Sequence, residues 1–377
     1  MTPPAPPLPP SVSATPPADP PAPDTRQLVA LTDDTGVFQH ALYATPDPNH
    51  GYCVDDNARA LIAAVELHAH DPALLVGLPH ERYLQFVVHA FDGPTRRFRN
   101  FMGFGRDWLE DVGSTDSQAR SMWSMAVAAA GHPDPNARDL AADVYRRAFD
   151  HADGFNAARS QAFVILAIDA WLTAHPADPP AEALLTRYAE ATLALFQQRA
   201  TPAWCWFEPI VAYDNARVCE ALLLAGQRLH RGDLVDTGLA SLAWLIERQT
   251  AEGGHLSIVG NDGWLTPDRP AAKFDQQPLE AHALVDACLL AARVTRDEAW
   301  RAAAAWAFAW FHGRNDLGVG LIDPHNGGCH DGLASHGVNR NQGAESTLAY
   351  LAAVLALHKD RREATPTRGD RRRAQPS

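Results

Sequence analysis

The sequence lacks several features that mark well-known classes of protein. Its five cysteines are scattered and form no C-x-x-C pair, which argues against a disulfide scaffold and favours a reducing compartment. No uninterrupted apolar run reaches the roughly 18 residues that a membrane-spanning helix needs. The N-terminus has no basic stretch followed by an apolar one, so it does not read as a secretory signal. These absences predict a cytoplasmic protein with no membrane partner.

Positive charge, phosphate-binding loops and metal-ligand spacings are scarce as well. The net charge is −13 at pH 7 and no basic stripe runs along the chain, which argues against nucleic acid as a partner. Two Gly-rich loops, 253–264 and 326–332, resemble β-hairpin tips and match neither common phosphate-binding pattern. His325, Cys329 and His330 match no standard zinc spacing. We therefore expect neither a metal nor another cofactor.

Helix-forming residues are abundant instead. Apolar residues make up 46% of the 377 positions, and Ala and Leu dominate them, which favours helices around a sizeable core. Residues 1–25 are rich in Pro and Ala and predict a disordered linker. Residues 26–358 are expected to form one helical domain. Residues 359–377, with their Arg-rich stretch, predict a disordered charged tail.

Six helical segments open in the same way, with a polar residue, a small residue, Arg or Glu, and then an apolar run. The recurring position is occupied by Arg59, Arg120, Arg159, Arg217, Glu280 and Glu345. Neighbouring members are roughly 40 to 65 residues apart, which is too long for a solenoid repeat and suits a helical hairpin with a variable loop. We expect six hairpins that close into a ring, with the polar helix starts gathered at one mouth.

Two kinds of helix alternate along the chain. Helices that are apolar nearly all round, which predicts an inner layer, are expected at 56–70, 116–131, 156–174, 214–230, 277–294 and 342–358. Amphipathic helices, which predict an outer layer, are expected at 79–91, 136–152, 181–200, 233–250 and 296–312. Residues 26–45 read as partly helical and would complete the outer layer. The predicted fold class is all-α, an (α/α)6 toroid.

The connections between these helices are unequal in length. Inner-to-outer turns are short, whereas the outer-to-inner loops are long at 92–115, 201–213, 251–276 and 313–341. In alternating antiparallel hairpins all outer-to-inner loops emerge on the same face. Long loops gathered on one face are usually functional. The mouth of the ring is therefore the expected site.

Charged side chains concentrate at this mouth. The acids are Asp55, Asp56, Asp116, Asp214, Asp275, Glu280 and Glu345, with Glu208 just before the fourth inner helix. Capping of helix starts accounts for single Asp residues but not for the Glu residues. Arg in a first helical turn opposes the helix dipole, and a buried cation needs a carboxylate partner. The mouth is thus expected to hold Arg–carboxylate pairs, direct substrate contacts, or both.

Aromatic residues accompany the acids in the long loops. They are Phe98, Phe101, Phe104, Trp108, Trp204, Trp206, Phe207 and Trp264. In an extended segment Trp204, Trp206 and Glu208 would point to the same side. Such rings either pack the loops onto the helices or present apolar faces to sugar rings.

Carboxylates on several helices around one basin suit cleavage of a glycosidic bond, which needs a carboxylic acid and a second carboxylate. We predict a glycoside hydrolase acting on an oligosaccharide, with the catalytic pair among Asp56, Asp116, Glu208, Glu280 and Glu345. The predicted substrate-binding residues are Asp55, Asn57, Arg59, Arg120, Arg159, Trp204, Trp206, Asp214, Asn215, Arg217, Trp264, His282 and His330. Inversion and retention of the anomeric centre both stay open.

Four motifs resemble a bacterial family of six-hairpin, glycosidase-like proteins. They are Thr-Asp-Asp-Thr-Gly at 32–36, Gln-His-Ala at 39–41, the segment 51–60, and Gly-Ala-Glu-Ser-Thr at 343–347. The resemblance covers nearly all of 26–358. In that family the toroid often forms the rear part of proteins labelled glycosyltransferase, which implies a separate glycosyltransferase partner in relatives. No doubly wound β-α alternation is found here, so the transferase domain itself is not expected.

Two other functions fit the same fold. A sugar epimerase or isomerase would use a His pair as acid and base, with candidates His255, His282, His330 and His336. A non-catalytic sugar-binding module that serves a glycosyltransferase would need no acid–base pair at all. The sequence leaves both alternatives open.

Overall fold

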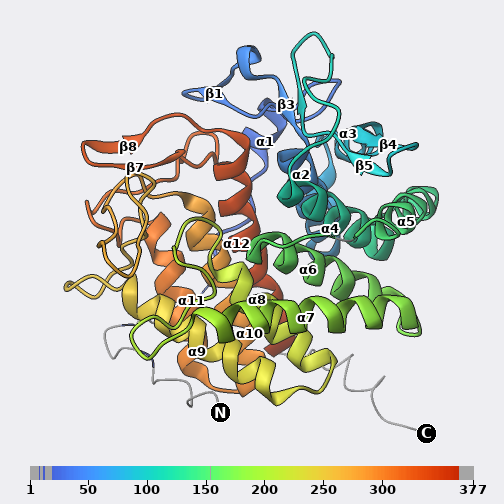
Figure 1. The fold of residues 1–377 in the computed structure, drawn as a ribbon. Helices are drawn as coiled ribbons and strands as arrows, with labels where there is room; N and C mark the ends of the chain where they lie inside the picture. Colours follow the sequence, from blue (N-terminus) through green and yellow to red (C-terminus); the bar gives the residue numbers. More distant parts are fainter. Residues whose placement is uncertain (1–7, 9–11, 13–18, 153, 365–377) are drawn as a thin grey trace, which may run out of the picture.

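The computed structural model describes residue 8, residue 12 and residues 19–152 and 154–364, and within them six long helices form a closed inner ring (Figure 1). These helices are α2 (Val54–His70), α4 (Thr115–Gly131), α6 (Ala158–Ala174), α8 (Ala216–Arg228), α10 (Pro278–Thr295) and α12 (Ala344–Ala364). Each contacts the next in this order, and α12 contacts α2. The predicted inner layer is confirmed.

An outer layer surrounds this ring. Its helices are α3 (Glu81–Ala90), α5 (Pro135–Phe149), α7 (Pro179–Arg199), α9 (Gly232–Arg248) and α11 (Glu298–Phe308). Each packs against the inner helix that precedes it in the chain. The short α1 (Arg26–Ala30) packs against α12 and takes the sixth outer position. The fold is therefore the predicted (α/α)6 toroid.

Local sequence explains the two layers. α6 is buried along nearly its whole length, as its apolar sequence requires, whereas α5 buries only one stripe, made of Ala141, Ala142, Val144, Tyr145 and Ala148. Outer helices α5 and α7 begin with Pro after an Asp whose side chain accepts a backbone N–H. Pro at a helix start preceded by a capping Asp ends the short turns sharply. Because the turns at one face are short, most of the connecting residues lie in loops at the other face.

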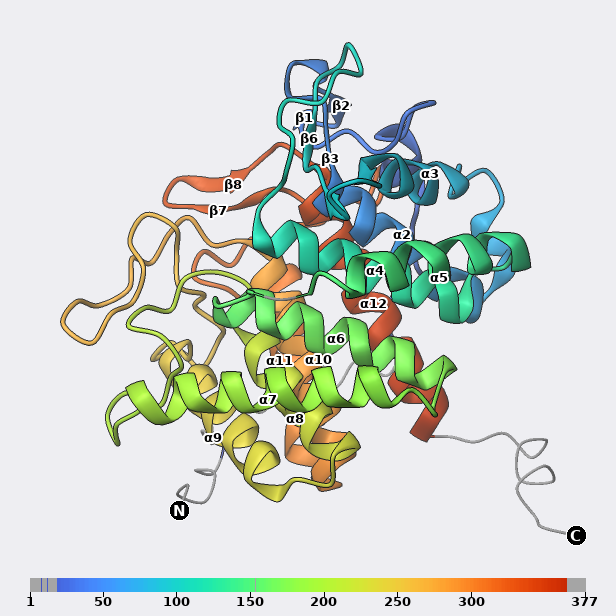
Figure 2. The ribbon, with the colours of Figure 1, turned by 45° about the vertical axis from the view of Figure 1, so that its right-hand side comes forward.

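Short strands and 3₁₀ turns build the loop face (Figure 2). The strand pairs are β1 (Ala41–Leu42) with β2 (Thr45–Pro46), β3 (Tyr52–Cys53) with β6 (Phe101–Met102), β4 (Phe91–Asp92) with β5 (Arg97–Phe98), and β7 (Gly332–Ala334) with β8 (Gly337–Asn339), all antiparallel. The 3₁₀ turns are η1 (Pro48–His50), η2 (Pro72–Leu75) and η3 (Ala309–Phe311). Single antiparallel bridges Thr250–Leu256 and Ile322–Cys329 close the two Gly-rich loops into hairpin-like turns.

The domain boundaries differ from the prediction at the end of the helical domain. α12 continues past residue 358 to Ala364, because Arg361 and Arg362 in its last turn contact Asp19 and His70. Residues 19–25 also lie against α12, where the Pro21 carbonyl contacts His358 Nε2 at 2.8 Å. Apart from residues 8 and 12, the rest of the predicted leader and tail lies outside the described residues. No helix among the described residues is long and apolar enough to cross a membrane.

Gly51 connects the loop face to the start of α2 and allows a test of this geometry. Its φ is +60°, and a Cβ there would overlap the Met102 carbonyl oxygen on β6. Gly51→Ala is expected to lower the free energy of unfolding by about 3 kcal/mol, measured by urea denaturation. Gly77 has a φ of +86°, but a Cβ there would meet no atom within 4 Å, so Gly77→Ala should cost only about 1 kcal/mol. Equal losses in the two variants would contradict the crowding argument.

Candidate active site

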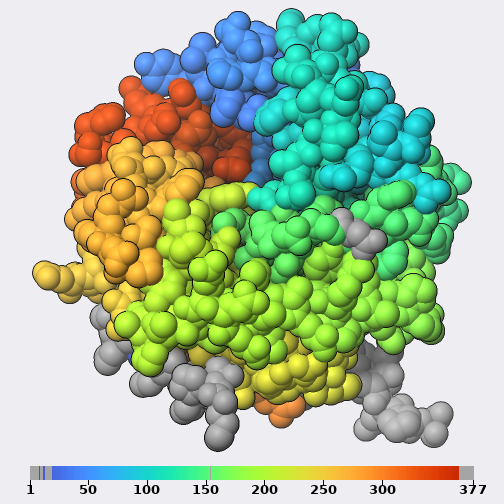
Figure 3. All heavy atoms as spheres, viewed as in Figure 1, coloured from blue at the N-terminus to red at the C-terminus, as the bar shows by residue number. Residues whose placement is uncertain are grey.

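A cavity of about 510 Å³ opens at the mouth, where the inner helices begin. Segments from the beginning, middle and end of the chain surround it in Figure 3. We call it the mouth cavity, and it is lined by Gln39, His40, Cys53, Asp55, Asp56, Arg59, Phe101, Ser114, Asp116, Arg120, Tyr213, Gln277, Asp331, Asn339, Asn341, Gly343, Glu345 and Ser346. Five of these residues are acids. The expected gathering of carboxylates at one mouth is therefore present.

The start of α2 places two consecutive acids, Asp55 and Asp56, in the cavity wall. Strand β3 ends at Cys53, whose sulfur caps the helix by accepting the Asp56 backbone N–H. The Cys53 thiol in turn donates to Asp56 Oδ2 at 3.0 Å. Only 3% of Asp56 is exposed, so its carboxyl is held in a nearly dry position at the edge of the cavity.

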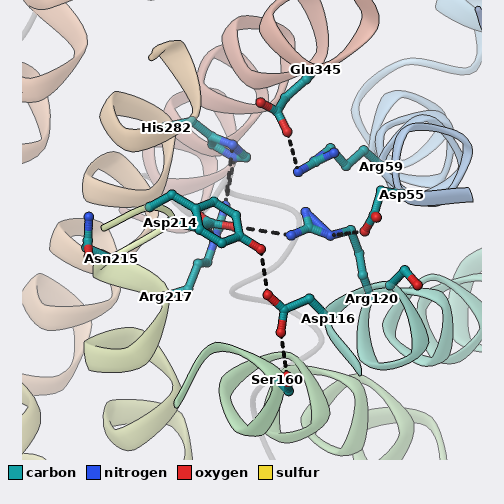
Figure 4. A network of polar contacts seen from close by, with 12 residues as sticks. Asp55, Arg59, Asp116, Arg120, Ser160, Asp214, Asn215, Arg217, His282 and Glu345 are labelled. Atoms are coloured by element: carbon teal, nitrogen blue, oxygen red, sulfur yellow. Dashed lines mark hydrogen bonds and ion pairs between the residues drawn. The ribbon is translucent and has the colours of Figure 1, made fainter. Parts of the chain in front are cut away.

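Arg59 links Asp56 to Glu345 on the neighbouring helix, and Figure 4 shows its contact with Glu345. Its Nη1 lies 2.9 Å from Asp56 Oδ1 and its Nη2 lies 2.7 Å from Glu345 Oε2. Burial, aided by the nearby Glu345 charge and opposed by the Arg59 guanidinium, raises the pKa of Asp56 to about 6. The Glu345 side chain is 38% exposed and reaches the solvent of the cavity. One guanidinium thus holds a buried acid and an accessible acid together.

Arg120 forms a second bridge across the mouth. Its Nε lies 2.9 Å from Asp55 Oδ1, and its Nη2 lies 3.4 Å from Asp214 Oδ2. The guanidinium also stacks on Phe163, with 4.2 Å between its central carbon and the ring centroid. Arg159 pairs with Glu208 at 2.9 Å in the same manner. The expectation that first-turn Arg residues take carboxylate partners is confirmed at each of these positions.

Asp116 lies at the start of α4 and receives two hydroxyl groups. Tyr213 donates its hydroxyl to Asp116 Oδ2 at 2.6 Å, and Ser160 donates to Oδ1 (Figure 4). The guanidinium of Arg159 lies over the Tyr213 ring at 5.3 Å. Burial raises the pKa of Tyr213, which keeps this phenol protonated as a donor. Two hydroxyl donors on its two oxygens fix the orientation of the Asp116 carboxylate.

Several cavity residues were not among the site residues predicted from the sequence. Asp331 is one: it accepts the Gly343 backbone N–H at 2.7 Å, and burial raises its pKa. His40 is another, and burial lowers its pKa. The signal for both was present, because His40 lies in a motif quoted above and Asp331 lies in the Gly-rich loop 326–332. Tyr213 also lines the cavity, and its position directly before the predicted site residue Asp214 was the corresponding signal.

Two of the predicted catalytic acids do not line the mouth cavity. Glu208 is held by Arg159, and burial raises its pKa against the effect of that cation. Glu280 is 2% exposed and accepts the backbone N–H groups of Asp214 and Asn215 and the Asn215 side-chain amide. Asp214 has a φ of +49°, a strained value for a residue other than glycine. Glu280 therefore fixes the entry to α8, and burial raises its pKa to about 7.

Trp204 and Trp206, which the sequence predicted as substrate-binding residues, are buried in the core. Trp206 is fully buried and stacks on Trp244 at 5.8 Å, and Trp204 meets the same ring edge-on at 5.1 Å. Their indole N–H groups donate to the carbonyls of Ile210 and Glu208. The segment is irregular rather than extended, and burial of large apolar rings under a loop explains the placement. Trp264 is 41% exposed, but it does not line the cavity.

The other predicted binding residues have structural contacts or lie deeper in the ring. Asn57 is buried and accepts the Val37 backbone N–H, while Asn215 is held by Glu280. Asp214, Arg217 and His282 line a small cavity of about 50 Å³ on the ring axis behind the mouth. His330 contacts the Arg340 carbonyl and does not line the mouth cavity.

The histidines proposed for an epimerase are not brought together. His255 pairs with Asp316 at 3.2 Å, and His282 pairs with Asp286 at 3.0 Å inside the ring. His336 lies in the β7–β8 turn. None of the four candidates lines the mouth cavity, where His40 is the only histidine of the lining. No group of three His, Cys, Asp or Glu residues within the described ranges is arranged to hold a metal ion.

The fold is similar to that of several sugar-processing enzymes. Cellobiose 2-epimerase from Bacillus thermoamylovorans matches with a TM-score of 0.70 and 12% identity, over 90% of this chain and 96% of the epimerase. A D-mannose isomerase matches with a TM-score of 0.65 and 13% identity, over 89% of this chain and 95% of the isomerase. No family model and no curated protein sequence matches the chain.

A third similar structure is a glycoside hydrolase. It is an α-1,6-mannanase of Salegentibacter in complex with α-1,6-mannotetrose, with a TM-score of 0.59 and 13% identity over 89% of this chain and 96% of the mannanase. That protein is an inactive variant in which two consecutive aspartates are replaced by alanine. At such low identity these similarities establish the (α/α)6 fold alone.

Replacement of Glu280 distinguishes its structural contacts from a catalytic role. Glu280→Ala leaves two backbone N–H groups and an amide buried without an acceptor, so we expect a loss of about 3 kcal/mol in the free energy of unfolding. Glu298→Ala is the matched control, since that side chain is exposed on α11 and its loss should cost at most about 0.5 kcal/mol. Urea denaturation measures both. A Glu280→Ala variant with normal stability and no activity would instead identify Glu280 as a member of the catalytic pair.

Proposed function

We propose that the protein is a carbohydrate-active enzyme, and specifically a glycoside hydrolase that cleaves an oligosaccharide at the mouth of the ring. The observation that carries this proposal is the pairing of Asp56 and Glu345 through Arg59 at the wall of a 510 Å³ cavity. Hydrolysis of a glycoside needs one protonated and one ionised carboxyl group near the same bond. Asp56 is buried with a raised pKa and Glu345 is exposed to the cavity, and these two environments suit the two roles.

Asp56 is assigned as the general acid. Its pKa of about 6 lies above that of an ordinary Asp because the carboxyl is buried and Glu345 is near, so it retains its proton in mildly acidic solution, below about pH 6. In the reaction this proton passes to the glycosidic oxygen as the bond to the anomeric carbon breaks. Arg59 limits the rise in pKa, which keeps the acid strong enough to release the proton.

Glu345 is assigned as the second carboxylate. It is the more exposed of the two acids on Arg59, so a water molecule or the anomeric carbon can reach it. Either it accepts a proton from the water that attacks the anomeric carbon, or it attacks that carbon itself, and the separation of the carboxyl groups decides between the two. Asp55, Asp116 and Asp331 line the same cavity and would accept hydrogen bonds from sugar hydroxyls.

The comparisons support this class of function without identifying it. The similar solved structures include a mannanase and cellulases as well as epimerases. The mannanase was inactivated by replacement of two consecutive aspartates, and the start of α2 presents the consecutive pair Asp55 and Asp56 to the cavity. An epimerase that uses a His pair is less well supported, because only His40 lines the mouth cavity.

Incubation with α-1,6-mannotetraose and with cellotetraose in D₂O tests the reaction class. We expect new reducing ends by chromatography from at least one of them, with no carbon-bound deuterium in the remaining sugar by mass spectrometry. Asp56→Asn and Glu345→Gln should each lower kcat by about 1,000-fold, the scale of a lost acid or base. Asp111→Asn, an exposed acid on a loop of the same face, is the control and should retain full activity. Deuterium uptake without cleavage would contradict the hydrolase proposal and favour an epimerase.

The pH profile of kcat/KM tests the assignment of Asp56. The general acid works in its protonated form, so activity should fall as the pH rises through about 6, the pKa of this carboxyl. Arg59→Met removes the cation that lowers this pKa, so the alkaline limb should move to higher pH. Arg59→Lys keeps the charge and should leave the limb close to its original place. A limb that stays fixed in Arg59→Met, with the variant folded, would exclude Asp56 as the acid.

A further inference from the structure

A second cavity, of about 350 Å³, lies on the ring axis behind the mouth. We call it the rear pocket. The later turns of α2, α10 and α12 line it together with residues of α4 and α8. The small axial cavity shares Arg59 and Arg120 with the mouth cavity and shares Trp123 and Arg217 with the rear pocket. The rear pocket is therefore separate from the candidate active site.

The floor of the rear pocket is a buried ionic cluster. Arg217 Nη1 lies 2.6 Å from Glu220 Oε2 and 2.8 Å from Asp286 Oδ2, and Asp286 also contacts His282 Nε2 at 3.0 Å. Desolvating several charges costs more than filling the same space with apolar side chains. If this part of the ring served stability alone, apolar side chains would be expected to fill the space. The cluster keeps the floor polar and rigid instead.

The lining of the rear pocket carries a half-buried acid, Glu66, and an exposed base, Lys359. Within the part of the chain that the structure describes, neither Glu66 nor Lys359 forms a side-chain hydrogen bond or an ion pair. Burial raises the pKa of Glu66 to about 7, and the charge of Lys359 opposes this rise. A half-buried group such as the Glu66 carboxyl is normally satisfied by a partner or by water, whereas the Lys359 ammonium is exposed to solvent. Glu66 and Lys359 therefore present an acceptor and a donor to whatever occupies the pocket.

The remaining surface of the pocket is neutral overall and partly apolar. Four acids and four bases line it, so no net charge selects an ion. Trp123 is half-buried and packs in parallel against Phe163, with 6.3 Å between ring centroids. Leu289 and Leu355 add apolar surface beside it. The Arg217 guanidinium lies over the Trp123 ring at 5.6 Å, so Leu289, Leu355 and the exposed part of Trp123 supply the apolar surface beside the donors and acceptors, as a small-molecule pocket requires.

We propose that the rear pocket is a second saccharide-binding site, which takes a neutral mono- or disaccharide. Sugar hydroxyl groups both donate and accept, so one ligand satisfies Glu66 and Lys359 together. The volume of about 350 Å³ lies in the usual range for small-molecule pockets. The site shares its ligand class with the proposed function but needs no reaction at the mouth. Its occupancy is therefore measurable even in a variant that cleaves nothing.

The chain offers a direct reporter of this site, because Lys273 and Lys359 are its only lysines. Lys273 is paired with Asp316 at 2.8 Å and lines neither cavity, so it is an internal control. The experiment measures acetylation of each lysine by peptide mass spectrometry in the full chain carrying Glu345→Gln, which prevents turnover. The probes are cellobiose and α-1,6-mannobiose, each titrated up to saturation.

We expect at least one of these disaccharides to slow acetylation of Lys359 about tenfold at saturation and to leave Lys273 unchanged. Adding Glu66→Gln should raise the concentration for half-protection about tenfold, since a charge-assisted hydrogen bond is lost. The wild-type protein should show the same protection of Lys359 as the Glu345→Gln variant. This last comparison separates failure of the rear site from failure of the proposed hydrolase.

Three results would overturn the proposal. The first is unchanged acetylation of Lys359 at saturating concentrations of both disaccharides. The second is equal slowing of Lys273, which would show a non-specific effect of sugar. The third is protection by glycine or by inorganic phosphate, with none by either disaccharide, which would replace the saccharide with an ionic ligand. Thermal denaturation of Glu66→Gln establishes that the variant is folded before its protection is compared.

Discussion

The arrangement of this toroid depends on buried guanidinium groups in the first turns of its inner helices. Arg near a helix start opposes the dipole, and its burial requires a carboxylate close by. Arg59 meets an acid of its own helix and one from α12, and Arg120 meets acids at the starts of α2 and α8. Each cation thereby fixes the position of one inner helix against another. The same pairing gathers the carboxylates at one mouth.

This constraint also explains how one cavity holds a buried acid and an exposed acid on the same cation. Asp56 is buried beside Cys53 and has a raised pKa, whereas Glu345 extends from the neighbouring helix into the solvent of the cavity. Both contact the same guanidinium, and the raised pKa of Asp56 comes mainly from its burial. The Arg–carboxylate pairs that stabilise the ring are thus also suited to acid–base chemistry. A structural role and a catalytic role do not exclude each other here.

The sequence predicted the fold well because the fold repeats. Six like helix starts and a consistent difference in loop length are enough to place both layers and the mouth. The site was predicted only in part, since Asp56, Asp116 and Glu345 line the cavity while Glu280 supports the strained entry to α8. Sequence shows that an acid lies at a helix start but not which backbone groups it accepts. Trp206 was predicted as a binding residue but is buried, because an aromatic residue in a long loop suits either a ligand or the core.

The axis of the ring shows why two separate sites can exist in one toroid. Six helices around a circle leave a central space that Ala63, Ala349 and Ala352 do not fill. About 50 Å³ remains between the mouth cavity and the rear pocket, which is too small for a sugar ring but large enough for water. A saccharide at one end therefore cannot pass to the other. Arg59 and Arg120 line both this narrow space and the mouth cavity, and Arg217 lines both this space and the rear pocket, so charged side chains lie between the two sites.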